Sequence, residues 1–181
     1  AAVDVRVAAI AFSADPGAAE RDAGFASLAD ARYRGRLCLA SSAQPINRAV
    51  IAALIEDIGV RPAEIAVRGW MANLALPVFA DEAELRAALA EERCEVGIVS
   101  VPGSAGASST TLIPAPVVAD VQAAGVARHA REPEAALRLI EWLATGRAAS
   151  PKAVHDTLRP VGNLAWRIED AVRLAQRAGY R

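Results

Sequence analysis

The stretch RGRLCLASS at residues 34–42 leads directly into PINRAVI at residues 45–51, and these two segments predict the centre of the fold. The unbroken apolar run at residues 37–39 is typical of a short strand that is covered on both faces. Apolar residues then recur every four positions as far as Ile58, and Gly59 follows. This spacing predicts an amphipathic helix that ends at the glycine, with a short polar turn between strand and helix.

Two serines, Ser41 and Ser42, fall in this turn. The first N–H groups of a helix have no partner within the helix, and the helix dipole adds partial positive charge at the same end. Together they form a site for a small anion, to which a serine hydroxyl could also donate. A serine here could equally serve only as the helix N-cap, and the residues alone leave both interpretations open.

Composition excludes several classes of function. A chain of 181 residues is long enough for one domain with a sizeable core. A net charge of −1 without a basic run gives no reason to expect a nucleic-acid partner, and no apolar run is long enough to span a membrane. Aromatic residues are only 4% of the chain, so we expect Trp70, Trp142 and Trp166 to lie mainly in the core.

The two cysteines, Cys38 and Cys94, permit one disulfide, or they are two buried free thiols. Each lies in or beside a strand-like run, and the residues alone do not choose between these states. The two histidines, His129 and His155, belong to no recognisable nucleophile or metal motif. We therefore expect a protein that is not an enzyme.

Strand patterns alternate with helix patterns along most of the chain, which predicts an α/β fold with a largely parallel sheet flanked by helices. Residues 1–181 are interpreted as a single domain. Residues 1–32 are expected to form a first strand with a loose lead-in, and residues 33–100 are expected to form the core. A Gly/Ser loop with a connection is expected at residues 101–121, and a return strand with C-terminal helices is expected at residues 122–181. Apolar alternation predicts the first strand from about Val3 to Phe12, and the return strand is expected at residues 125–129. Helices are expected from Pro62 to about Leu76 and at residues 132–144.

Several segments, taken in order, resemble the periplasmic ferric-iron-binding proteins of ABC uptake systems. They are Tyr33 to Ser42, Gly69 to Ala75, Cys94 to Val99, Gly125 to Ala130, Glu134 to Leu143, Asn163 to Trp166 and Ala178 to Arg181. The resemblance implies one lobe of a type II periplasmic binding protein, mainly the second lobe and the C-terminal part. The family's first lobe has no counterpart here. The resemblance also implies a periplasmic location, and it favours the Cys38–Cys94 disulfide, because several relatives carry both cysteines and the periplasm is oxidising.

The resemblance also suggests ligand contacts. Ser41, Ser42 and Ala43 stand at the positions of the family's helix-N-terminal anion site, and Asn47 follows them. The facing loop supplies the remaining expected contacts, which are Ser100, Gly103 and Ser104.

The family's adjacent tyrosine pair is missing, because its positions read Pro102 and Gly103. Ferric iron needs anionic oxygen ligands, and this loop offers only hydroxyl and backbone groups. The implied ligand is therefore a small anion or a ferric chelate, and no site for bare metal is expected.

Two functions remain as hypotheses. The first is a solute-binding protein, or a truncated relative of one, that works with ABC permease subunits. The alternative is a single-lobe interaction module that pairs with a separate first lobe or forms a homodimer, because a lone lobe exposes a surface that its partner normally covers.

Overall fold

The computed structural model of the protein describes residues 2–102, 108, 110–147 and 165–181. Within these ranges the strands are β1 (Ala2–Phe12), β2 (Leu37–Cys38), β3 (Val96–Pro102), β4 (Thr111–Leu112) and β5 (Ala119–Ala123). The α-helices are α1 (Ala18–Arg21), α2 (Pro45–Ile58), α3 (Val60–Ala72), α4 (Glu82–Ala90), α5 (Pro133–Arg147) and α6 (Ile168–Ala178). Short 3-10 helices lie at η1 (Ala26–Ala29), η2 (Ala31–Tyr33) and η4 (Ala165–Arg167).

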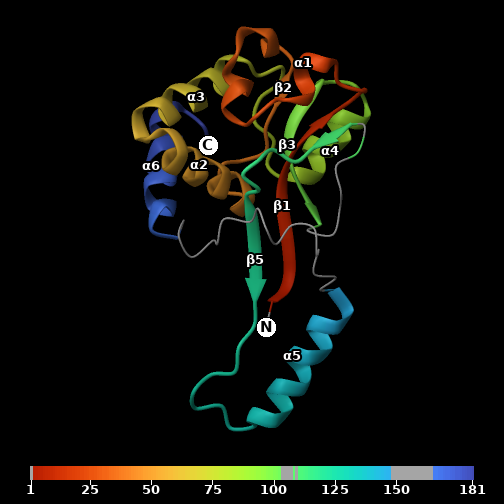
Figure 1. The fold of residues 1–181 in the computed structure, drawn as a ribbon, viewed down its shortest axis with the longest axis vertical. Helices are drawn as coiled ribbons and strands as arrows, with labels where there is room; N and C mark the ends of the chain where they lie inside the picture. Colours follow the sequence, from red (N-terminus) through yellow and green to blue (C-terminus); the bar gives the residue numbers. More distant parts are fainter. Residues whose placement is uncertain (1, 103–107, 109, 148–164) are drawn as a thin grey trace.

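The sheet has the order β2-β3-β1-β4, and β5 also pairs with β1 (Figure 1). The expected α/β class is confirmed, but the expectation of a largely parallel sheet is wrong. β1 runs antiparallel to β3, β4 and β5, whereas β2 and β3 are parallel. A helical crossover makes neighbouring strands parallel, and α2, α3 and α4 provide such a crossover between β2 and β3. β1 instead takes its neighbours from distant parts of the chain.

β1 is the buried centre of the sheet, and the expectation that the strand near residues 36–40 is central is wrong, because β2 lies at the edge of the sheet and pairs with β3 alone among the described strands. Its residues 6–12 pair with residues 96–102 of β3, and residues 7–10 are fully buried. Ala8 and Ile10 belong to the main apolar cluster, whereas Ala9 belongs to a second cluster on the other face. Both faces of the strand are therefore covered by side chains from other elements.

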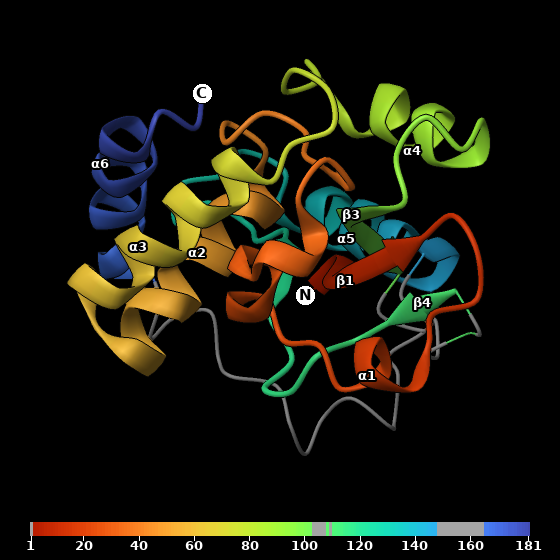
Figure 2. The ribbon, with the colours of Figure 1, turned by 90° about the horizontal axis from the view of Figure 1, so that it is seen from above.

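Helices cover the two faces of the sheet unequally. Figure 2 shows α2, α3 and α6 grouped on one side and α4 on the other. The second cluster packs Leu85 and Leu89 of α4 against Cys38 and Cys94. These cysteines form a disulfide with a Cα–Cα distance of 6.0 Å, which confirms the pairing that the resemblance favours. The disulfide ties β2 to the segment that enters β3.

The three tryptophans differ in their surroundings. Trp70 of α3 is 1% exposed and donates its indole N–H to the Phe25 carbonyl oxygen over 3.0 Å. Trp142 and Trp166 are 69% and 59% exposed, so the expectation that all three lie in the core is wrong for these two. The guanidinium carbon of Arg167 lies 3.6 Å from the centroid of the Trp166 ring. Trp142 lies on α5. α5 extends away from α2, α3 and α6, beside the first residues of β1 (Figure 1).

Two predicted elements end or begin elsewhere. The helix expected to reach about Leu76 ends at Ala72, because the next residues pair with β2. The Ala75 and Phe79 amides donate to the Leu37 and Leu39 carbonyl oxygens over 2.8 and 3.0 Å. This pairing covers the edge that β2 leaves open.

The return strand is β5, at residues 119–123, and the expected strand at residues 125–129 is not formed. The helix expected at residues 132–144 is present as α5. The division of residues 1–181 into one domain with four parts stays a prediction. Among the described residues, no helix has the length and apolar character needed to cross a membrane.

Candidate functional site

The turn between β2 and α2 is held by its own backbone and by one serine. The Ser41 amide donates to the Phe79 carbonyl oxygen over 2.8 Å, and the Gln44 amide donates to the Ser41 carbonyl oxygen over 3.0 Å. The Ser41 hydroxyl oxygen accepts the Ala43 amide over 3.2 Å. The N-cap of α2 is Gln44, which makes no side-chain cap bond. Neither serine therefore caps the helix, and the capping interpretation is wrong.

A pocket of about 440 Å³ opens on one side of this turn, and we call it the serine pocket. Its lining residues are Ser41, Ser42, Ala43, Arg48, Val172, Gln176, Tyr180 and Arg181. The lining residues include two arginines and no aspartate or glutamate. The Arg48 guanidinium donates to the Ser42 carbonyl oxygen over 3.3 Å, which fixes it beside the turn. The pocket is therefore electropositive, as an anion site requires.

Asn47 supports this turn from within the core, where it is 3% exposed. Its amide nitrogen donates to the carbonyl oxygens of Ala40 and Ser41, both over 3.1 Å. The phenol of Tyr180 donates to the same Ala40 oxygen over 2.6 Å. Asn47 does not line the serine pocket, and its hydrogen bonds hold the backbone of the turn in position.

The two tyrosines are buried, and their phenols stay protonated at neutral pH. Burial raises the pKa of Tyr180 far above its usual range, and a hydrogen bond with Asn47 offsets this only in part. Burial is also the largest cause of the raised pKa of Tyr33. Burial thus disfavours the phenolate form of both side chains.

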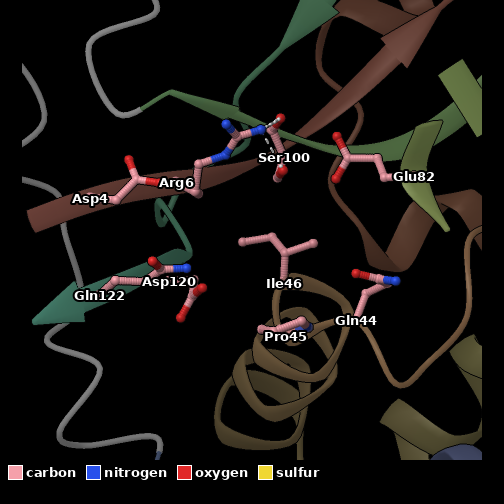
Figure 3. Close-up of a pocket in the computed structure, with 9 residues that line it drawn as sticks. All are labelled: Asp4, Arg6, Gln44, Pro45, Ile46, Glu82, Ser100, Asp120 and Gln122. Atoms are coloured by element: carbon pink, nitrogen blue, oxygen red, sulfur yellow. Dashed lines mark hydrogen bonds between the residues drawn. The ribbon is translucent and has the colours of Figure 1, made fainter. Parts of the chain in front are cut away.

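Ser100 lies on the other side of the turn, at the end of β3. Its hydroxyl and carbonyl oxygens both accept from the Arg6 guanidinium, each over 2.9 Å. Its carbonyl oxygen also accepts from Arg86 over 2.6 Å. Figure 3 shows the Arg6 side chain turned toward Ser100. Ser100 is therefore held by two cations that distant parts of the chain supply.

Ser100 lines a second pocket, of about 270 Å³, which we call the strand pocket. Its lining residues are Asp4 and Arg6 of β1, Asp120 and Gln122 of β5, Gln44, Pro45 and Ile46 at the start of α2, Glu82 of α4, and Ser100 (Figure 3). Unlike the serine pocket, it carries charges of both signs. The carboxylate of Glu82 is ion-paired with Arg86 over 2.7 Å.

The structure thus divides the predicted ligand contacts. Ser41, Ser42 and Ala43 line the serine pocket, and Ser100 lines the strand pocket. Gly103 and Ser104 lie outside the described residues. Those of the predicted contacts that the structure describes therefore do not line a single pocket.

Sequence reasoning missed the charged residues of both pockets. Arg48 and Arg181 in the serine pocket gave no signal, because an arginine on a helix or at an exposed position is usually solvated. A signal did exist for the strand pocket. Asp4 and Arg6 interrupt a strand that is otherwise apolar, and a polar face on a central strand points to a surface with a use. Within the described residues, no three His, Cys, Asp or Glu side chains are grouped to hold a metal ion.

No protein-family model matches this chain, and no curated protein matches its sequence. Its fold, a mixed sheet with helices on both faces, is that of the type II periplasmic binding proteins. Solved ferric-binding proteins have this fold and superpose on nearly the whole chain.

Two of these structures are ferric-binding proteins, and a third was solved in complex with iron and citrate. The Bordetella ferric binding protein is 21% identical, with a TM-score of 0.72 over 99% of this chain and 69% of its own. The ferric binding protein from Campylobacter jejuni is 14% identical, with a TM-score of 0.76 over 99% and 70%. The Trichodesmium protein IdiA (FutA), solved with iron and citrate, is 18% identical, with a TM-score of 0.76 over 99% and 70%. At these identities, the resemblance to the ferric-iron-binding family is confirmed as a likeness of fold.

Proposed function

We propose that this chain is a periplasmic solute-binding protein, or a truncated relative of one, that serves an ABC-type iron(III) uptake system. In this role it delivers its solute to permease subunits. The observation that carries the proposal is the superposition of 99% of the chain on ferric-binding proteins. The proposed ligand is a small anion or a ferric chelate, bound in the serine pocket by Ser41, Ser42 and Ala43.

The charge of the serine pocket supports an anionic ligand. Arg48 and Arg181 bring two guanidinium groups to a lining that has no carboxylate side chain. Guanidinium groups bind carboxylate and phosphate oxygens through paired hydrogen bonds. Ser41 and Ser42 are partly exposed, so their hydroxyl groups can reach a ligand.

The tyrosines argue against bare ferric iron. A hard ferric ion needs several anionic oxygen ligands. Tyr180 lines the serine pocket, but its phenol is buried and donates to the Ala40 carbonyl oxygen. A chelate brings its own oxygen ligands and presents a negative surface to the protein. Ferric citrate is the first probe to test, because the Trichodesmium protein was solved with iron and citrate.

Calorimetric titration with ferric citrate, citrate, phosphate and carbonate tests this proposal. We expect ferric citrate to bind, and we expect Arg48→Gln to weaken its binding by about tenfold or more, because a charged hydrogen bond is lost. Arg173→Gln on α6 is the matched control, since Arg173 makes only exposed ion pairs and lines neither pocket. A flat titration with all four probes would contradict the proposal, as would equal weakening by both variants.

We infer as an alternative function an interaction module that pairs with a separate lobe or with a second copy. Its support is the exposure of apolar side chains on α5, where Leu139 and Trp142 lie on the same side of the helix and, like Leu137, are more than half exposed. In addition, the chain covers 69–70% of the length of the ferric-binding chains above, so about 30% of each of those chains has no counterpart in the superposition. Light scattering tests this alternative. We expect an assembly larger than the monomer that Leu139→Glu dissociates, and a monomer over the whole concentration range would rule out self-pairing.

A further inference from the structure

The strand pocket contains a polar patch built by two adjacent strands. β1 and β5 are antiparallel, and their register places Arg6 opposite Asp120 and Asp4 opposite Gln122. Side chains two residues apart point to the same face of a strand, and directly opposed residues on paired strands lie close together. All four side chains therefore share one face of the β1–β5 ribbon, and all four line the pocket.

The charges in this patch do not neutralise one another. Arg6 lies opposite Asp120, but its guanidinium is turned to Ser100, where it makes two hydrogen bonds of 2.9 Å. Among the described residues, no ion pair within 4.0 Å involves Arg6, Asp4 or Asp120. The pocket thus holds a fixed cation and two carboxylates that are each available to a ligand.

A ligand with a single charge does not suit this arrangement. An anion at Arg6 would face the carboxylates of Asp4, Asp120 and Glu82 in the same pocket. A simple cation at Asp4 or Asp120 would face Arg6. A small molecule with a carboxylate at one end and an ammonium at the other satisfies both sets of groups.

We propose that the strand pocket binds a small α-amino acid in its dipolar form. The ligand carboxylate pairs with the Arg6 guanidinium and accepts from the Ser100 hydroxyl, close to the positive end of α2. The ligand ammonium lies between Asp4 and Asp120. The side chain of Ile46 points into the pocket and provides an apolar contact (Figure 3). A volume of about 270 Å³ favours amino acids with short side chains.

This site goes beyond the proposed function, because its lining shares no residue with the serine pocket. The two proposals therefore succeed or fail separately. Arg48→Gln should weaken ferric citrate and leave amino-acid binding unchanged, whereas Asp120→Asn should do the reverse.

Calorimetric titration of the whole chain at constant ionic strength tests the inference. The probes are glycine, L-alanine and L-serine, with propionate and ethylamine as analogues of alanine that each lack one charged group. We expect at least one amino acid to bind, and we expect propionate and ethylamine to bind about tenfold more weakly or not at all. Absence of binding by all three amino acids overturns the inference, and so does propionate or ethylamine binding as tightly as alanine.

Variants then locate the site. We expect Asp120→Asn, Asp4→Asn and Arg6→Gln each to weaken amino-acid binding by about tenfold. Glu169→Gln on α6 is the matched control, because its carboxylate is 84% exposed and lies outside the pocket. If circular dichroism shows that Arg6→Gln does not fold, the two aspartate variants decide the question. Binding that survives both aspartate substitutions overturns the inference.

Discussion

Reduction of the Cys38–Cys94 disulfide should destabilise the protein substantially. The disulfide closes a segment with a sequence separation of 56 residues, so in the chain-entropy model it stabilises the fold by roughly 4 kcal/mol. Domains are stable by only about 5–15 kcal/mol, which makes this a large share of the total. With a urea m-value of about 2 kcal/mol per molar, the midpoint of unfolding should fall by about 2 M.

The assay compares urea unfolding of the oxidised protein and of the protein reduced under denaturing conditions and refolded in reductant. The double variant Cys38→Ala, Cys94→Ala removes the disulfide without a reductant, and it should lie roughly 1–2 kcal/mol below the reduced protein because two buried sulfur atoms are lost. Equal unfolding midpoints for the oxidised and reduced proteins would refute the reasoning from loop closure.

The remaining predictions concern buried residues of the core. Gly69→Ala should lower the free energy of unfolding in urea by about 1–3 kcal/mol, because the new Cβ would lie 2.5 Å from the Ala29 Cβ. An unchanged free energy of unfolding would show that α3 and η1 can move apart without cost. Tyr180→Phe should cost roughly 1 kcal/mol, since Ala40 loses one of its hydrogen bonds; a neutral result would mean that Asn47 satisfies that oxygen alone. The raised pKa values of Tyr180 and Tyr33 keep both phenols protonated in the folded state above pH 10, where the unfolded chain ionises. The stabilisation from the two protonated tyrosines is therefore complete below about pH 10 and is lost as the pH rises beyond it. The free energy of unfolding should fall by up to about 1.4 kcal/mol per pH unit for each tyrosine. A free energy of unfolding that stays constant from about pH 9 to 11 would contradict this.

The two pockets on either side of the Ser41–Gln44 turn have opposite chemical character. The serine pocket is lined by two arginines and by no aspartate or glutamate, while residues of both charges line the strand pocket. A single anion site that joined Ser41 to Ser100 would therefore have placed its ligand beside Asp4 and Asp120. The separation explains why the anion proposal is tied to Arg48, and why the strand pocket calls for a ligand of a different class.

Local sequence determined two of the regular elements of this protein, α2 and β1. The four-residue spacing of apolar residues after Pro45 and the glycine at position 59 predict both ends of α2, Pro45 and Ile58. Local sequence suffices here because the backbone hydrogen bonds of an α-helix join residues only four positions apart. Apolar alternation likewise predicted β1, from about Val3 to Phe12. The disulfide, by contrast, was left open by the two cysteines themselves and followed from the family resemblance.

Only the tertiary structure decided which strands meet β1 and which residues meet in each pocket. Arg6 contacts Ser100, which lies 94 positions later, and Tyr180 contacts Ala40 over a separation of 140 positions. Such contacts depend on strand register and on side-chain direction, and neither is encoded in the periodicity of one segment. The Ser41 hydroxyl shows the same limit on a small scale. The sequence suggests that a serine of this turn, Ser42, caps α2, but the N-cap is Gln44, and the Ser41 hydroxyl accepts the Ala43 amide within the turn.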